Sequence, residues 1–285
     1  MKKNFIISLP LLLAFISCPT SGPTSNEQTP NVMPAAQSGA FLDVSYGAHP
    51  GNKMDVYLCK NIELNTPTLI FIHGGGFTSG DKSDFQFPSG ATDSGLNIVR
   101  MNYRFAQTGS VTYKEMLDDI AAVIAFLRNK KTEYNCNFEK ISLYGVSAGG
   151  ALALLYSYKR GGIHSAISLA GVVDFTDSNF VAMCGEDAVK DLLNKLLPEN
   201  SETYKADASP ITHARNPDNP YRNTTTLLFH GRNDTVVPYT QAEELFAVIE
   251  SLNVKNKKFI YKNCGHGFGA EFTEEIVRET LNAVK

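Results

Sequence analysis

Two absences narrow what this chain can do: it has no tryptophan, and it has no excess of charge of one sign. Its 26 lysines and arginines stand against 29 aspartates and glutamates, which gives a formal net charge of -3. Both signs are mixed along the chain, so it lacks the basic footprint that nucleic acids and anionic membrane surfaces attract. The usual stacking platform for a sugar ring is missing, but 12 tyrosines and 17 phenylalanines can take its place. Neutral substrates are therefore admissible, and nucleic acid is not expected as a partner.

The N-terminus lacks an apolar run long enough to form a mature transmembrane helix. Its run at residues 5–16 follows two lysines and ends at the small residue Ser17. A basic start, a short apolar stretch and a small residue are typical of an export signal that is later removed. We therefore expect residues 1–17 to be a signal peptide and the protein to be exported.

The four residues Phe15-Ile16-Ser17-Cys18 resemble the cleavage box of bacterial lipoproteins, although the box usually has leucine where this chain has Phe15. The resemblance implies that Cys18 carries lipid, which would be the only attachment to a membrane. Residues 19–38 are rich in Pro, Thr, Ser, Asn and Gln and cannot bury enough apolar surface to fold. We expect residues 18–39 to be a flexible tether and the location to be the bacterial cell envelope. Ordinary cleavage, giving a periplasmic or secreted protein, is the alternative.

The remaining pattern predicts one α/β domain. The chain has 285 residues, of which 43% are hydrophobic, enough to bury a parallel sheet. Residues 41–46 and 53–58 alternate polar and apolar side chains around Pro50-Gly51-Asn52, which predicts an antiparallel hairpin at the sheet edge. From residue 68 onward, short apolar strands alternate with helical patterns, as in βαβ units. We expect strands at residues 68–72, 140–144, 166–169, 226–229 and 258–261, and helices at 116–127, 241–251 and 271–284.

The pentapeptide Gly145-Val146-Ser147-Ala148-Gly149 is the most informative stretch. It joins a strand-like run to the helix-like run at residues 150–155, which is the context of a nucleophile elbow. Glycines on both sides of the serine allow a turn too tight for a larger side chain. The pattern therefore predicts that Ser147 is an exposed nucleophile.

Three further matches follow predicted strands. His73-Gly74-Gly75-Gly76 comes after the strand at residues 68–72, and such a loop supplies backbone N–H donors to an oxyanion. Asp234 comes after the strand at 226–229, and His266 comes after the strand that ends at 261. The chain order Ser, Asp, His is that of the α/β-hydrolases.

From about residue 41 to residue 285 the chain resembles the α/β-hydrolase superfamily, and within it the serine esterases that have an HGGG loop. Its elbow reads Ser-Ala-Gly-Gly, as in small carboxylesterases and in acetyl and feruloyl esterases that act on polysaccharides. Prolyl-peptidase relatives more often carry an aromatic residue where this chain has Ala148. The resemblance implies a catalytic domain at residues 40–285 with a mostly parallel, doubly wound sheet of about eight strands. It also implies a small cap at about residues 177–223, in which the sequence predicts one helix at 186–197.

The resemblance also assigns roles to the matched residues. A serine hydroxyl needs a base within hydrogen-bond reach, and His266 is the histidine on a glycine-flanked loop after the last strand. Asp234 would orient His266 and stabilise the imidazolium. The backbone N–H groups of Gly75, Gly76 and Ala148 would bind the oxyanion.

One residue competes for the role of the acid, and other residues near the predicted site have different interpretations. Asp174 follows a predicted strand and is the alternative acid. His73 and His230 are interpreted as loop-bracing residues whose imidazoles bond to the backbone. Phe77 and Phe268 flank the oxyanion loop and the base, and either pocket lining or plain packing would explain them.

Four cysteines remain once Cys18 is set aside, and their spacing suggests no metal site. They are Cys59, Cys136, Cys184 and Cys264, which allow three disulfide pairings. Cys184 and Cys264 follow strands whose ends lie on the face of the predicted site, so we favour that pair. Buried free thiols are the alternative.

Together these observations predict an exported serine ester hydrolase that works through an acyl-enzyme, without metal or cofactor. The expected substrates are small acyl esters, above all acetyl or related esters on carbohydrates, whether small molecules or polysaccharides. A general short-chain carboxylesterase or lipase-like enzyme, a peptidase and an arylformamidase are the alternative enzymes. A surface-binding lipoprotein without turnover is the alternative of a different class.

Overall fold

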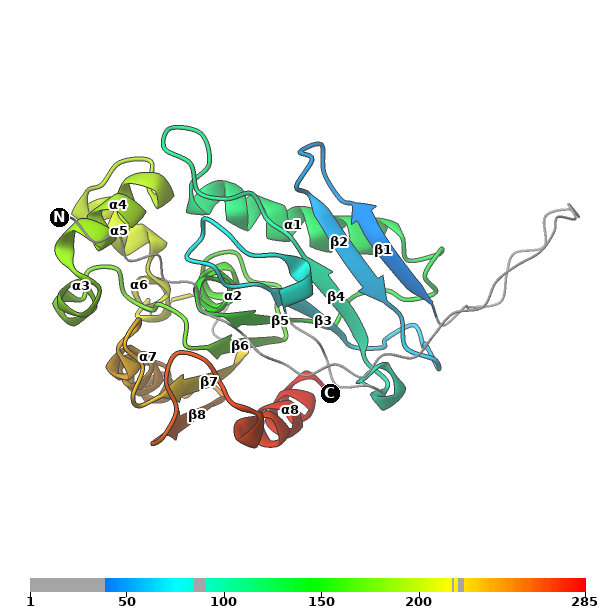
Figure 1. Ribbon diagram of the computed structural model, residues 1–285. Helices are drawn as coiled ribbons and strands as arrows, with labels where there is room; N and C mark the ends of the chain where they lie inside the picture. Colours follow the sequence, from blue (N-terminus) through cyan, green and yellow to red (C-terminus); the bar gives the residue numbers. More distant parts are fainter. Residues whose placement is uncertain (1–38, 85–90, 217, 220–222) are drawn as a thin grey trace, which may run out of the picture. The chain divides into compact units, whose positions relative to one another are not determined.

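The computed structural model describes residues 39–84, 91–216, 218–219 and 223–285 (Figure 1), all of which belong to one compact unit. The predicted signal peptide, Cys18 and the tether up to residue 38 lie outside the described residues.

The framework is an eight-stranded sheet in the order β1-β2-β4-β3-β5-β6-β7-β8. Its first two strands pair antiparallel to each other, β2 pairs antiparallel to β4, and all other pairs are parallel. The predicted fold class is thereby confirmed. The strands are β1 (Ala40–Ser45), β2 (Lys53–Tyr57), β3 (Thr68–Ile72), β4 (Asn97–Met101), β5 (Ile141–Val146), β6 (Ser165–Leu169), β7 (Thr225–Gly231) and β8 (Asn256–Tyr261).

Eight α-helices and two 3-10 turns complete the described residues. The helices are α1 (Tyr113–Asn129), α2 (Ala148–Lys159), α3 (Ser178–Cys184), α4 (Glu186–Leu196), α5 (Glu202–Ala208), α6 (Pro210–Ala214), α7 (Tyr239–Ser251) and α8 (Ala270–Val284). The 3-10 turns are η1 (Lys82–Asp84) and η2 (Ala91–Ser94).

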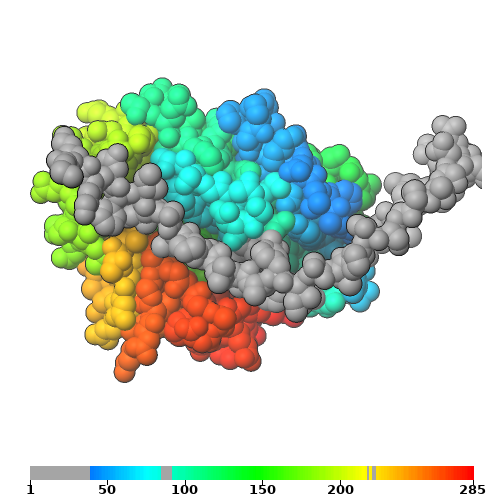
Figure 2. Space-filling model, viewed as in Figure 1, coloured from blue at the N-terminus to red at the C-terminus, as the bar shows by residue number. Residues whose placement is uncertain are grey.

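The predicted hairpin forms the antiparallel edge of the sheet. Its turn is closed by backbone hydrogen bonds from Asn52 to His49 (2.8 Å) and from Tyr46 to Asn52 (3.1 Å). Most side chains of β1 are exposed, and the blue hairpin forms part of the surface in Figure 2. β1 thus forms the edge of the sheet, and only its partly buried Phe41 and Val44 pack against the core.

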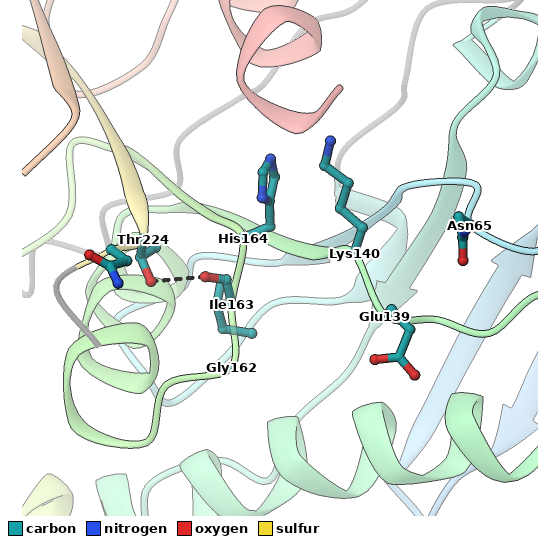
Figure 3. Close-up of a pocket in the computed structure, with 8 residues that line it drawn as sticks. Asn65, Glu139, Lys140, Gly162, Ile163, His164 and Thr224 are labelled. Atoms are coloured by element: carbon teal, nitrogen blue, oxygen red, sulfur yellow. Dashed lines mark hydrogen bonds between the residues drawn. The ribbon is translucent and has the colours of Figure 1, made fainter. Parts of the chain in front are cut away.

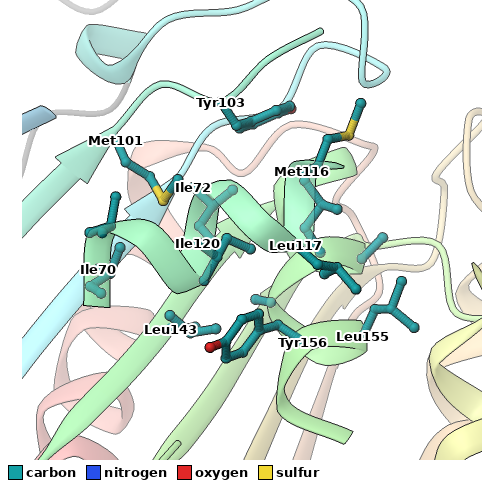
Figure 4. Packing of buried hydrophobic residues seen from close by; sticks show 14 of the residues in the cluster. Ile70, Ile72, Met101, Tyr103, Met116, Leu117, Ile120, Leu143, Leu155 and Tyr156 are labelled. Atoms are coloured by element: carbon teal, nitrogen blue, oxygen red, sulfur yellow. The ribbon is translucent and has the colours of Figure 1, made fainter. Parts of the chain in front are cut away.

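Alternation along the strands divides the core between the two faces of the sheet. Ile70 and Ile72 of β3 pack with residues of α1 and α2 (Figure 4), whereas Leu69 and Phe71 belong to the cluster that α8 covers. Each of these four side chains is at most 1% exposed. Burying such a side chain fully contributes about 1.5–3 kcal/mol, so the two layers hold β3 and β5 firmly.

Helix α1 begins at a complete capping box. The Thr112 side chain accepts from the backbone of Lys114 at 3.2 Å, and Glu115 accepts from the backbone of Thr112 at 2.7 Å. Such a cap contributes about 1 kcal/mol. The Arg104 guanidinium pairs with buried Asp119 at 2.9 Å and thereby ties the chain after β4 to this helix.

The segment after β6 departs from the sequence-based expectation. One helix is predicted at residues 186–197, and the structure has four helices there, α3 to α6, of which α4 matches the prediction. The other three have five or seven residues, too few to show a helical period. They persist because Phe180, Ala208 and Ile211 are buried in the core. Figure 1 shows the four helices gathered beside α2 and α7.

Candidate active site

The turn between β5 and α2 presents Ser147 in a strained conformation. Its φ is 53° and its ψ is −120°, which a non-glycine residue rarely adopts. A Cβ on Gly145 would lie 2.1 Å from the carbonyl oxygen of Gly149, and a Cβ on Gly149 would lie 2.0 Å from that of Ile72. Both contacts are with backbone atoms, so both positions require glycine. The glycines of the pentapeptide therefore allow the turn to pack directly against itself and against β3.

Ser147 and His266 are joined by a hydrogen bond, and His266 is joined to Asp234 in turn. The distance from Ser147 Oγ to His266 Nε2 is 2.9 Å, and that from His266 Nδ1 to Asp234 Oδ2 is 2.8 Å. An ionised carboxylate can only accept, so Nδ1 carries the hydrogen and Nε2 is free to accept from the serine hydroxyl. The structure thus brings together the three residues that the sequence selects from three separate loops.

Asp234 is buried and strongly hydrogen-bonded. Its side chain is 0% exposed, whereas that of His266 is 21% exposed. The backbone N–H groups of Val236 and Val237 donate to its Oδ1 at 2.8 and 2.9 Å. Burial opposes ionisation, but hydrogen bonds from His230 and His266 outweigh it and hold the pKa of this carboxyl well below its ordinary value. Asp234 is therefore a carboxylate throughout the neutral range.

The alternative acid, Asp174, has a different task. Its Oδ1 accepts from the backbone and the hydroxyl of Thr176 at 2.8 and 2.6 Å and from Ser209 Oγ at 3.5 Å. These contacts close a turn after β6 and fasten the start of α6. The structure thus places Asp234, and not Asp174, against His266.

The glycine loop after β3 lies against the serine. A Cβ on Gly74 would lie 3.4 Å from Ser147 Cβ, so the loop passes beside the elbow. Gly75 and Gly76 have φ of 96° and 58°, and the Gly75 carbonyl accepts from the backbone of Ser79 at 3.1 Å. Ala148 is the first residue of α2, where a backbone N–H has no acceptor within the helix. Oxyanion binding by Gly75, Gly76 and Ala148 remains a prediction that this arrangement permits.

His73 and Tyr103 brace this loop from behind. The His73 ring stacks on Tyr103 with centroids 4.3 Å apart, and its Nδ1 donates to the Gly74 carbonyl at 2.8 Å. The Tyr103 hydroxyl donates to the His73 carbonyl at 3.1 Å. Burial lowers the pKa of His73, so the ring is neutral. The sequence-based interpretation of His73 as a loop-bracing residue agrees with these contacts.

The two flanking phenylalanines pack into the protein. Phe77 is 3% exposed and lies 6.0 Å from the ring of Phe175. Phe268 is partly buried and lies edge-on to Tyr261 at 6.1 Å. Packing accounts for both residues.

Two exposed apolar side chains lie on the loop of Asp234 and on the helix that packs against it. Met183 is 42% exposed and Val236 is 44% exposed. They belong to neighbouring segments, because the Cys184 thiol at the end of α3 donates to the Val236 carbonyl at 2.9 Å. Val236 follows Asp234 by two residues in the chain, whereas the packing of α3 onto the loop after β7 brings the segment of Met183 to it.

The four described cysteines are free thiols, so the favoured pair of Cys184 and Cys264 is not joined in the structure. Cys184 bonds to Val236, and Cys264 turns into its own loop, where it donates to the Gly267 carbonyl at 3.4 Å. Cys184 and Cys264 follow strands β6 and β8, which are separated by β7 in the sheet, and their thiols bond to different carbonyls.

Other features of the described residues do not add to the site. A cleft lined by residues that include Lys140, His164 and Thr224 (Figure 3) lies at the amino ends of β5, β6 and β7, opposite Ser147. No group of three or more His, Cys, Asp or Glu among the described residues could hold a metal ion. Within the same ranges, no helix combines the length and the apolar character that crossing a bilayer requires.

Two curated relatives show what kind of protein this chain is similar to. It is 28% identical to the "Probable carboxylic ester hydrolase LipM" of Mycobacterium tuberculosis over 70% of this chain and 49% of that protein. It is 24% identical to a "Probable isoprenylcysteine alpha-carbonyl methylesterase" of Arabidopsis thaliana over 78% of this chain and 50% of that protein. The chain thus spans about half the length of these relatives.

Solved structures share the fold, and a family model matches most of the sequence. A truncated carbohydrate esterase from gut microbiota superposes with a TM-score of 0.72 at 18% identity, over 87% of this chain and 97% of that one. Esterase B of Lactobacillus rhamnosis superposes with a TM-score of 0.69 at 20% identity, over 86% and 85%. The model of the BD-FAE family matches residues 54–249, which include Ser147 and Asp234. The chain therefore belongs to the BD-FAE family and has the α/β-hydrolase fold.

Proposed function

We propose that this protein is a serine ester hydrolase that works through an acyl-enzyme. The observation that carries the proposal is the pair of hydrogen bonds from Ser147 to His266 and from His266 to Asp234, at 2.9 and 2.8 Å. Among the residues that the structure describes, Ser147 is the serine that combines a strained backbone, partial exposure and a hydrogen bond to a histidine. A protein that merely bound a ligand would need none of this arrangement.

In the first half of the reaction, Ser147 Oγ attacks the ester carbonyl while its proton passes to His266 Nε2. Asp234 stabilises the resulting imidazolium and keeps the ring in place. The oxyanion is bound by backbone N–H groups of Gly75, Gly76 and Ala148, and one such donor is worth about 3–4 kcal/mol in comparable sites. His266 then returns the proton to the departing alkoxide, which leaves as the alcohol.

In the second half, a water molecule takes the place of the alcohol. His266 removes a proton from the water as it attacks the acyl carbonyl, and the same donors bind the second oxyanion. The carboxylic acid leaves when His266 returns the proton to Ser147 Oγ. No metal or cofactor is required by this sequence of steps.

Small acyl esters on carbohydrates are the proposed substrates. Support comes from the carbohydrate esterase among the structural neighbours. A general short-chain carboxylesterase is the second candidate, favoured by the similarity to LipM. Because one badly fitted methylene costs only about 1–3 kcal/mol, rates should decline gradually from acetyl to longer acyl chains.

The test has two stages. A fluorophosphonate probe should label the wild-type protein and spare Ser147→Ala, and absence of labelling in the wild type would end the proposal. A series of p-nitrophenyl esters is then compared with acetylated oligosaccharides. Faster cleavage of decanoyl than of acetyl esters would contradict the preference for small acyl groups, and indifference to the sugar would favour the general carboxylesterase.

We also propose that the protein is exported and held at the cell envelope by lipid on Cys18. The support is the sequence of residues 1–18 and the polar segment that follows. One acyl chain binds membranes only weakly, so stable anchoring needs the several chains of a mature lipoprotein. Cys18→Ala should release the protein from the membrane fraction or stall its processing. An unmodified N-terminus in an intact-mass measurement would contradict the lipid anchor.

A further inference from the structure

A second histidine contacts the acid of the proposed site. His230 lies near the end of β7, and its side chain is 1% exposed. Its Nε2 is 3.0 Å from the Val237 carbonyl oxygen and 3.1 Å from Asp234 Oδ2. A carbonyl oxygen can only accept, so Nε2 carries a hydrogen and shares it between these two acceptors.

This donor completes the hydrogen bonding of the carboxylate. An ionised carboxylate offers about four acceptor positions. Two backbone N–H groups occupy Oδ1, from Val236 and Val237, and two histidines occupy Oδ2, His266 at 2.8 Å and His230 at 3.1 Å. Without His230, Oδ2 would have only the base to hold it.

We propose that His230 is a positioning residue for the reaction. It fixes the Asp234 carboxylate in the orientation that meets His266, and it takes up part of the carboxylate's negative charge. This inference rests on the proposed function, because it assigns His230 a task in the same acid–base chain. The contact with the Val237 carbonyl matters as well, since it orients the imidazole that reaches Asp234.

The charge on Oδ2 is thus divided between two histidines. The thiols of Cys184 and Cys264 also interact with Asp234, and burial is the main cause of the raised pKa of both. Both thiols are therefore neutral, and the histidines are the groups that share the charge. Removing the His230 donor would leave more of the negative charge of Asp234 to stabilise protonated His266, which cannot accept the Ser147 proton. The fall of kcat/KM on acidification, which is the acid limb of the pH profile, should therefore begin at higher pH.

Three variants test whether His230 acts as a hydrogen-bond donor to Asp234 or only fills space. His230→Gln keeps an N–H of similar reach, His230→Asn has the same amide on a shorter stem, and His230→Leu fills the space without a donor. A displacement of about 1 Å in the acid–base chain can cost on the order of 10²-fold in rate, so we expect a loss of kcat on this scale for Asn and Leu. KM should stay nearly unchanged, Gln should recover most of the rate, and the acid limb should move for Asn and Leu only.

A matched control is available in the same chain. His213 Nε2 donates to the Asp207 carbonyl at 2.8 Å and lies 3.8 Å from an Asp207 carboxylate oxygen, in the segment of α5 and α6. His213→Leu therefore removes a similar contact from another aspartate and should leave kcat and the pH profile unchanged.

The measurements are kcat, KM and the pH profile with p-nitrophenyl acetate, together with fluorophosphonate labelling. If His230→Asn retains the kcat and the acid limb of the wild type, His230 has no positioning role, even though the active wild type upholds the proposed function. If the wild type is neither labelled nor active, the proposed function fails and the role of His230 fails with it. Should His230→Leu not fold, the difference between Gln and Asn decides.

Discussion

The turn at Ser147 and the helical segment from α3 to α6 both follow parallel strands, but they are constrained in different ways. At the turn, backbone atoms lie so close that a Cβ on Gly149 would stand 2.0 Å from another carbonyl oxygen. In the segment, short helices are held mainly by buried side chains such as Phe180 and Ile211. Backbone contact of this kind allows no substitution, whereas burial tolerates changes that keep volume and apolarity. The proposed nucleophile thus lies in the rigid region, whereas the helical segment can change its sequence more freely.

The largest effect should come from the centre of the rigid region. Ser147→Ala removes the nucleophile, and removal of a comparable serine lowers kcat by about 10⁶-fold. The variant should still fold, since alanine is smaller and the flanking glycines remain. Steady-state rates with p-nitrophenyl acetate and circular dichroism check both statements. Near-normal turnover by the folded variant would remove Ser147 from the mechanism.

The next effect distinguishes the two candidate acids. Asp234→Asn should lower kcat by about 10⁴-fold, because the amide favours the wrong tautomer of the base. Asp174→Asn changes only a turn and should stay within about tenfold of the wild type, consistent with a small loss of stability. The comparison uses kcat and KM for both variants. A crippled Asp174→Asn beside a mild Asp234→Asn would reverse the assignment.

A second pair of variants tests the comparison of the two regions directly. Gly149→Ala forces a methyl group against the Ile72 carbonyl and should abolish the native fold or destabilise it by more than about 4 kcal/mol, as the most severe substitutions do. Met183→Ala in α3 removes a partly exposed side chain and should change the unfolding free energy by about 0.5 kcal/mol. Urea denaturation measures both. Equal losses would show that the segment is as constrained as the turn.

The smallest effect concerns acid stability. The pKa of Asp234 lies below its ordinary value, so its ionised form stabilises the folded state above the unfolded-state pKa of about 3.9. This contribution is lost as the pH falls below that value toward the lower pKa of the folded state. The difference in unfolding free energy between wild type and Asp234→Asn should therefore shrink between pH 6 and pH 3. A difference that grows on acidification would contradict the sign.

Much of the site could be predicted from the sequence because its constraints are local. Gly145, Ser147 and Gly149 lie within five consecutive residues, so a local motif is enough to predict the turn. The strands of the parallel sheet are apolar on both faces and stand out against the turns between them. The loops that carry Asp234 and His266 each follow such a strand, and the order of the strands in the fold places them near the elbow.

Other features depend on contacts between distant segments, which no local pattern records. Helices α3, α5 and α6 are too short for a period, and they form because the core accepts their buried residues. The same holds for the thiol of Cys184, which meets the Val236 carbonyl and not Cys264.

The sequence by itself determined the strand-rich α/β pattern, the tight turn and the identity of the three residues that meet there, since each depends on neighbouring residues or on chain order. Tertiary structure alone decided that His230 shares the Asp234 carboxylate, and that the Cys184 thiol meets the Val236 carbonyl and not Cys264. The physical reason is that a hydrogen bond requires placement within a few tenths of an ångström, and only the assembled core provides that placement.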